Sequence, residues 1–123
     1  MVIEHDVRMI RAFAEVARAD GYAISVFDGG EWSLKSSRDV AAIVEHATGV
    51  DEATLLIRDA RGRKVGTVFI VNGNSPGETI ADFSDNELTA QLVYDADTIY
   101  WREAPAAERA FSPYYPGHLD DAP

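Results

Sequence analysis

The sequence predicts an α+β domain built on one largely antiparallel sheet of about five strands, with the helices on one face. Three observations predict this class: an amphipathic helical stripe near the N-terminus, two β-hairpin patterns, and turn residues between the elements. The expected order is α-β-β-α-β-β-β-(α), followed by an irregular C-terminal tail rich in proline and aromatic residues. A chain of 123 residues can form one domain with a core that needs no disulfide.

The first element is a helix over residues 3–19, because its apolar residues recur at spacings of three and four and form one stripe. Asp20 and Gly21 end the helix, and Gly21 can take the left-handed conformation that closes a helix. The stripe consists of Ile3, Val7, Ile10, Phe13 and Ala17.

Residues 22–35 follow as a first hairpin, in which apolar and polar side chains alternate on both sides of a turn at residues 28–30. A second helix starts within residues 36–39, where either serine can act as the N-cap and Asp39 favours the positive end of the helix. Gly49 ends this helix.

The central hairpin pairs residues 53–57 with residues 65–71, through a loop at residues 58–64 in which Gly62 supplies a positive φ. Both strands are apolar on both faces, which places them centrally in the sheet. If all helices lie on one face, the second face must be polar or covered, and these strands favour cover by the aromatic tail or by a second subunit.

A further strand, which follows the central hairpin, is predicted at residues 78–83 after a loop at residues 72–77. The sequence Ser-Asp-Asn-Glu at residues 84–87 matches a capping box and predicts a final helix. An extended conformation at residues 91–94 and 98–101 is the alternative, because β-branched and aromatic residues gather there. The helical stripe would consist of Leu88, Leu92, Ala96 and Ile99.

The composition changes after residue 104, so we expect a domain over residues 1–104 and an irregular tail over residues 105–123. Prolines recur in this tail, and the helical and strand periodicities are lost. Aromatic residues beside prolines can dock into a groove on the same domain or on a partner. Tyr114 and Tyr115 are therefore candidate partner-binding residues.

The formal charge of −10 argues against general affinity for nucleic acid or anionic membranes. The charge is unevenly distributed. Residues 65–101 contain no lysine or arginine, whereas the hairpin loop that precedes them is basic. Such a layout can steer a charged protein partner or pair with a second copy of the chain. The basic candidates for partner binding are Arg58, Arg61, Arg63 and Lys64.

Cysteine is absent, which excludes disulfides, thiolate catalysis and zinc–thiolate sites and fits a reducing compartment. The first residues show no signal-peptide pattern, and no window approaches the ~20 apolar residues that span a bilayer. We therefore expect a cytoplasmic protein that does not bind membranes.

No motif predicts a catalytic, metal or cofactor site. Residues 73–77 have the Gly-x-Ser-x-Gly spacing of a nucleophile elbow, but a strand follows instead of a helix, and Pro76 lacks the N–H of an oxyanion hole. The histidines lie at no metal-ligand spacing. Asp95 and Asp97 would point to the same side only in a strand, where a weak cation site is geometrically possible.

These observations favour a small, acidic, non-catalytic protein-interaction module that self-associates. A second interpretation is an acidic mimic of nucleic acid that inhibits a DNA-binding protein, based on the carboxylates of residues 78–97. A third is an unrecognised carboxylate- and metal-dependent enzyme centred on residues 82–97.

Overall fold

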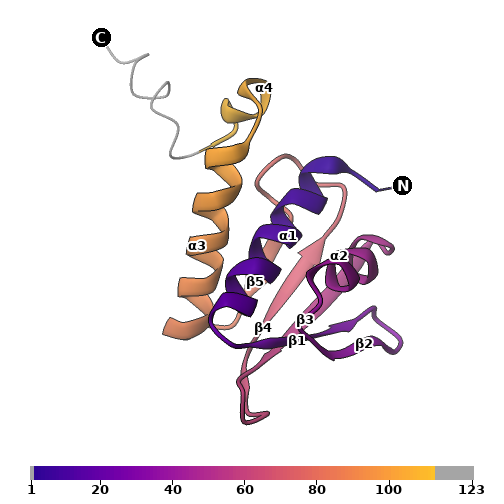
Figure 1. Cartoon of the computed structure of the whole chain (residues 1–123). Coiled ribbons are helices and arrows are strands. Elements are labelled where there is room, and N and C mark those ends of the chain that lie inside the picture. Colours follow the sequence, from indigo (N-terminus) through magenta and orange to yellow (C-terminus); the bar gives the residue numbers. More distant parts are fainter. Residues whose placement is uncertain (1, 113–123) are drawn as a thin grey trace.

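The computed structural model describes residues 2–112 and confirms the α+β class and the predicted order of the first eight elements (Figure 1). A further short helix follows them. The elements are α1 (Glu4–Ala19), β1 (Ala23–Phe27), β2 (Trp32–Ser37), α2 (Val40–Thr48), β3 (Glu52–Arg58), β4 (Lys64–Val71), β5 (Ile80–Phe83), α3 (Glu87–Glu103) and α4 (Ala106–Arg109).

The five strands form one sheet in the order β2-β1-β3-β4-β5, and every neighbouring pair is antiparallel. Strand β3 lies in the centre, as its two-sided apolar sequence predicts. It pairs with β1 across the connection that contains α2 and with β4 through the hairpin loop. Strands β2 and β5 form the two edges.

The helices α1, α2 and α3 cover one face of the sheet, and α1 packs against both of the others (Figure 1). Alternate side chains of the three inner strands point into this layer and meet the apolar stripes of the helices. The resulting core contains Ile10, Phe13, Ile24, Val26, Ile43, Leu55, Ile57, Val68, Ile70, Leu92 and Ala96.

The second face of the sheet, called the open face below, carries the intervening side chains of the same strands. None of the helices within residues 2–112 packs on this face. The sequence suggested the aromatic tail as a cover for this face, but residues 113–123 of that tail lie outside the described residues. The open face includes Phe27 on β1, Glu52, Thr54 and Leu56 on β3, Thr67, Phe69 and Val71 on β4, and the cross-strand neighbours Trp32 and Asp82.

The two helix starts differ from the sequence prediction. Asp39, not a serine, is the N-cap of α2, and its side chain accepts a hydrogen bond from the Ala42 N–H at 3.2 Å. Asn86 is the N-cap of α3, so the predicted capping box is wrong. The hydroxyl of Ser84 is already used by the sheet, because it accepts a 2.9 Å hydrogen bond from the Thr67 N–H.

Residues 87–103 are helical, so the extended alternative for this segment is wrong. The buried stripe of α3 also differs from the prediction, because Leu88 is 57% exposed and Thr89 is fully buried in its place. Gly66 of β4 makes room for Thr89: a Cβ at this glycine would lie 2.1 Å from Thr89 Oγ1. The close approach of helix to sheet therefore selects the small residues at both positions.

The predicted irregular tail begins with one helical turn, α4, which starts after Pro105. Glu108 of this turn pairs with Arg8 of α1 and accepts a 3.0 Å hydrogen bond from the Tyr100 hydroxyl. The Arg8 guanidinium lies 4.9 Å from the centroid of the Tyr100 ring. Burial, followed by the contact with Glu108, raises the pKa of Tyr100 far above its ordinary value, so the hydroxyl keeps its proton and donates.

A buried carboxylate fastens α1 to the loop between β4 and β5. Asp6 is fully buried and accepts hydrogen bonds from the Thr79 hydroxyl at 2.5 Å and from the Gly73 N–H at 2.9 Å. The neighbouring His5 Nε2 donates to the carbonyl oxygen of Asn74 at 2.7 Å. The loop therefore lies against α1 and leads into β5, not into the helix that a nucleophile elbow requires.

We predict that Asp6→Ala lowers the free energy of unfolding by about 2–3 kcal/mol, because it leaves the buried Thr79 hydroxyl and Gly73 N–H without their acceptor. Asp6→Asn keeps one acceptor oxygen and should lose less. Urea unfolding measures both changes. Glu4→Ala, at an exposed position in the same turn, is the control and should cost less than about 1 kcal/mol; equal losses at both positions would contradict the assignment.

Candidate functional site

The carboxylates and histidines of the described residues do not gather into a metal-binding group of three or more. Because residues 87–103 are helical, Asp95 and Asp97 project to different sides of α3. Asp95 accepts a 2.8 Å hydrogen bond from Gln91, whereas Asp97 accepts a hydrogen bond from the Trp101 indole N–H. The cation site that an extended segment would have allowed is therefore not formed by this pair.

A row of side chains crosses the open face from one sheet edge to the other. The strand registers place Trp32 opposite Phe27, Phe27 opposite Thr54, Thr54 opposite Phe69 and Phe69 opposite Asp82. The rings of Trp32 and Phe27 meet edge to face, with centroids 5.1 Å apart. Trp32 is 43% exposed, and Phe27 and Phe69 are half-buried. Aromatic surface is therefore partly exposed on a sheet face that none of the helices within residues 2–112 covers.

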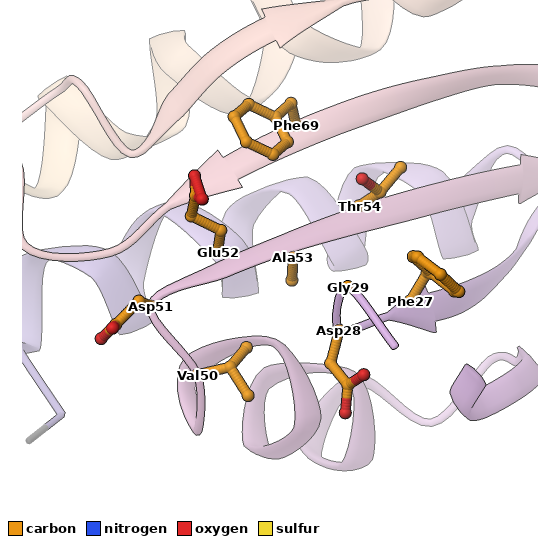
Figure 2. Close-up of a pocket in the computed structure, with 9 residues that line it drawn as sticks. All are labelled: Phe27, Asp28, Gly29, Val50, Asp51, Glu52, Ala53, Thr54 and Phe69. Carbon is orange, nitrogen blue, oxygen red and sulfur yellow. The ribbon is translucent and has the colours of Figure 1, made fainter. Parts of the chain in front are cut away.

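A hollow of about 410 Å³ opens at one end of this row, where β1 ends and β3 begins. We call it the acidic hollow. Figure 2 shows Glu52 and Thr54 projecting from one side of β3 and Ala53 from the other. The hollow is lined by Phe27, Asp28, Gly29, Val50, Asp51, Glu52, Ala53, Thr54 and Phe69.

The three carboxylates of the acidic hollow differ in their bonding. Asp28 holds the β1–β2 turn, since its Oδ1 accepts from the N–H groups of Gly30 and Glu31 at 3.2 and 3.1 Å. Asp51 and Glu52 are exposed, and their carboxylates make no hydrogen bond or ion pair within residues 2–112. No lysine or arginine lines the hollow. It therefore has two carboxylates without a partner among the described residues: Glu52 projects beside Phe69, whereas Asp51, just before β3, points away from the aromatic rings (Figure 2).

A smaller hollow of about 250 Å³ lies on the other side of Phe69. It shares Thr54 and Phe69 with the acidic hollow and continues over Thr67 to the edge strand at Asp82 and Phe83. The Phe69 ring therefore stands as a ridge between two depressions of the open face.

The basic candidates lie together at the tip of the β3–β4 hairpin, called the basic tip below: residues 58–64. Asp59 organises it, accepting hydrogen bonds from the N–H groups of Arg61 and Arg63, both at 2.9 Å, and from Arg63 Nε at 3.0 Å. These bonds, led by the one from the Arg63 backbone, lower the pKa of Asp59. Arg58 donates to the Gly62 carbonyl oxygen at 2.9 Å.

The four predicted basic residues therefore fall into two pairs. Arg58 and Arg63 hold the loop, whereas Arg61 and Lys64 are exposed and their side chains make no hydrogen bond or ion pair in the part of the chain that the structure describes. The last two are the charges available to a partner. The predicted aromatic candidates Tyr114 and Tyr115 lie outside the described residues.

A separate hollow of about 320 Å³ lies between α3 and the loop before β5. Asp97 and Trp101 line it, and Gly77 packs so closely on the indole that a Cβ there would lie 2.2 Å from Trp101 Cζ2. Burial raises the pKa of Asp97, and the hydrogen bond from Trp101 offsets part of this rise. The ionised carboxylate therefore costs the fold some stability.

This cost predicts a pH-dependent effect of Asp97→Asn, which keeps an acceptor for Trp101. Folding raises the pKa of this carboxyl above its unfolded value of 3.8. The free energy of unfolding therefore falls as the pH rises from the unfolded pKa through the folded pKa, whereas below the unfolded pKa the group has no such effect. The variant should gain up to about 1 kcal/mol at pH 7, since Asp97 is partly solvated, and nothing at pH 3. Urea unfolding at both pH values tests this, with Asp95→Asn as control; a loss of stability at pH 7 would contradict it.

Sequence reasoning identified the basic tip but missed the acidic hollow and the aromatic row. The alternation of β1 and β4 already puts Phe27 and Phe69 on the faces opposite Val26 and Val68. The missing information was the pairing of β1 with β3, because these strands are not consecutive in the chain. Only that pairing places Phe27, Thr54 and Phe69 in one row.

The chain matches no known protein-family model, no curated protein sequence and no solved structure. None of the helices among the described residues is long and apolar enough to cross a membrane.

Proposed function

We propose that this protein is a small, non-catalytic protein-interaction module whose contact surface is the open face. The observation that carries the proposal is the row of partly exposed aromatic residues, Trp32, Phe27 and Phe69, on a sheet face that no helix of residues 2–112 covers. An antiparallel sheet with one solvated face ordinarily carries polar residues there. Contiguous apolar surface bordered by polar groups is typical of interaction sites.

The composition of the open face resembles that of a protein interface. Its centre is aromatic, at the half-buried Phe27 and Phe69, and threonines on both strands supply hydroxyl groups without charge. The charged side chains lie at its borders: in the acidic hollow, on the basic tip and at Asp82 of the edge strand β5. Interfaces generally combine such an apolar centre, enriched in aromatic residues and depleted of charge, with a polar rim.

The alternative interpretations have less support from the geometry. An acidic mimic needs carboxylates arranged on one surface like phosphates, yet Asp95 and Asp97 project to different sides of α3, and Asp97 is half-buried beside Trp101. A carboxylate-dependent enzyme needs several metal ligands to converge, and the described residues supply no such group.

A photo-cross-linking experiment tests the contact surface directly. The photoreactive residue p-benzoylphenylalanine replaces Phe69 on the open face or, as the matched control, Tyr94 on α3, which is 57% exposed. After irradiation in cells of the source organism, we expect a discrete protein adduct from position 69 and none of the same mass from position 94.

The adduct should also depend on the rest of the aromatic row. Trp32→Ala in the position-69 protein should reduce the yield of the adduct severalfold, because truncation of a central aromatic residue often removes a large part of the binding energy. Circular dichroism checks that this variant stays folded. A protein that cross-links equally from both positions, or from neither, would contradict the proposed contact surface.

A further inference from the structure

We propose that the partner on the open face is a second copy of this chain, bound so that each basic tip enters the acidic hollow of the other copy. This inference rests on the proposed function, because it assigns an occupant to the same face. It follows from three properties of the described residues: the placement of the two charged regions, the absence of internal partners for their charges, and the size of the face.

The acidic hollow and the basic tip lie at opposite ends of the same sheet. Strand β1 pairs with β3 so that Phe27 lies opposite Thr54 at one end and Ala23 lies opposite Arg58 at the other. The first pair borders the acidic hollow, and Arg58 begins the basic tip. The open face is therefore electrically asymmetric along its strands, negative at one end and positive at the other.

This asymmetry selects one arrangement of two facing copies. A two-fold axis that lies between the two open faces and runs perpendicular to the strands reverses the strand direction. The basic tip of each copy then meets the acidic hollow of the other, which gives two equivalent contacts. An axis parallel to the strands would place tip on tip and hollow on hollow, with repulsion at both ends. The favoured arrangement also brings the aromatic rows of the two copies, with Phe27 and Phe69 near their centres, against each other.

The chemistry of the hollow suits the side chains of the tip. Arg61 and Lys64 have no partner among the described residues, and neither do Asp51 and Glu52 in the hollow. The aromatic rings of the hollow add surface on which a guanidinium can stack. Each contact would therefore pair charges that have no partner within residues 2–112 of a single copy.

The open face and the tip together offer an area of the order that a stable dimer needs. Five strands spaced about 4.8 Å apart present a sheet plane on the order of 500 Å². A stable, specific interface generally buries about 800 Å² on each partner. The side chains give the face more accessible surface than its flat plane, and a basic tip that reaches over the other copy adds further contact.

Two oppositely charged variants test the arrangement. One carries Arg61→Glu and Lys64→Glu on the tip, and the other carries Asp51→Lys and Glu52→Lys in the hollow. Sedimentation velocity of the full chain should show a dimer for the wild type and a dissociation constant raised at least about tenfold for each variant alone, because each change acts twice in a symmetric dimer. An equimolar mixture should form a heterodimer in which both contacts are restored.

Matched variants separate the specific contact from the effect of net charge. Arg11→Glu with Arg102→Glu reproduces the first change in charge, and Glu15→Lys with Glu103→Lys reproduces the second, all at exposed positions on α1 and α3. The dissociation constants of these dimers should lie within about threefold of the wild-type value. Mixing the two matched variants should not strengthen dimerisation. Equal weakening by the matched variants would overturn the tip-and-hollow contact.

A monomeric wild-type protein at its highest soluble concentration would overturn self-association. Native mass spectrometry of the position-69 adduct then tests separately whether the open face is a contact surface and whether its partner is a second copy of the chain. An adduct with the mass of another protein keeps the open face as an interaction surface and rejects the second copy as its occupant. The absence of any adduct rejects both.

Discussion

The one-sided packing of the helices is the constraint from which the other features follow. Because α1, α2 and α3 all cover the same face, the strands bury one set of alternate side chains under the helices and leave the other set outside this layer. The open face nevertheless carries Trp32, Phe27 and Phe69 in one row across the strands. The helices thus complete the core on one side of the sheet, and the proposed contact surface is the other side.

The charged groups of the protein fall into two sets, those that hold the fold together and those at the two ends of the open face. Those that hold the fold have internal partners: Asp6 accepts from Thr79 and Gly73, and Glu108 pairs with Arg8. The unpaired charges at the two ends of the open face have no such partners in the described part of the chain. Changes to the second group should therefore alter association while leaving stability nearly unchanged, which makes a contact role separable from a structural one by experiment.

Local sequence patterns predicted the elements well because each depends on nearby residues. The apolar spacing of α1, the turn at Asp28 and the positive φ of Gly62 all act over a few positions and were confirmed. The errors arose where tertiary contacts decide. Ser84 could not cap α3 because its hydroxyl bonds to the Thr67 N–H, and Leu88 could not be buried because Thr89 occupies the space above Gly66.

The candidate site was predictable only in part, for the same reason. The basic tip is contiguous in sequence and was identified, whereas the acidic hollow joins the end of β1 to the start of β3 and requires the sheet order. Asp6 carried a signal that the sequence reasoning did not use. It lies on the helical face of Ile3, Ile10 and Phe13, and a carboxylate on a buried stripe indicates a hydrogen-bonded structural role.

The measurement that tests the central claim most directly is a dilution series of the ¹⁵N-labelled protein followed by two-dimensional NMR. The account predicts concentration-dependent shifts for amides of β1, β3 and β4 on the open face and for the basic tip, with the exposed positions of α1 and α3 unchanged. Shifts confined to the helices, or a spectrum that does not change with concentration, would contradict the assignment of the open face as the contact between two copies.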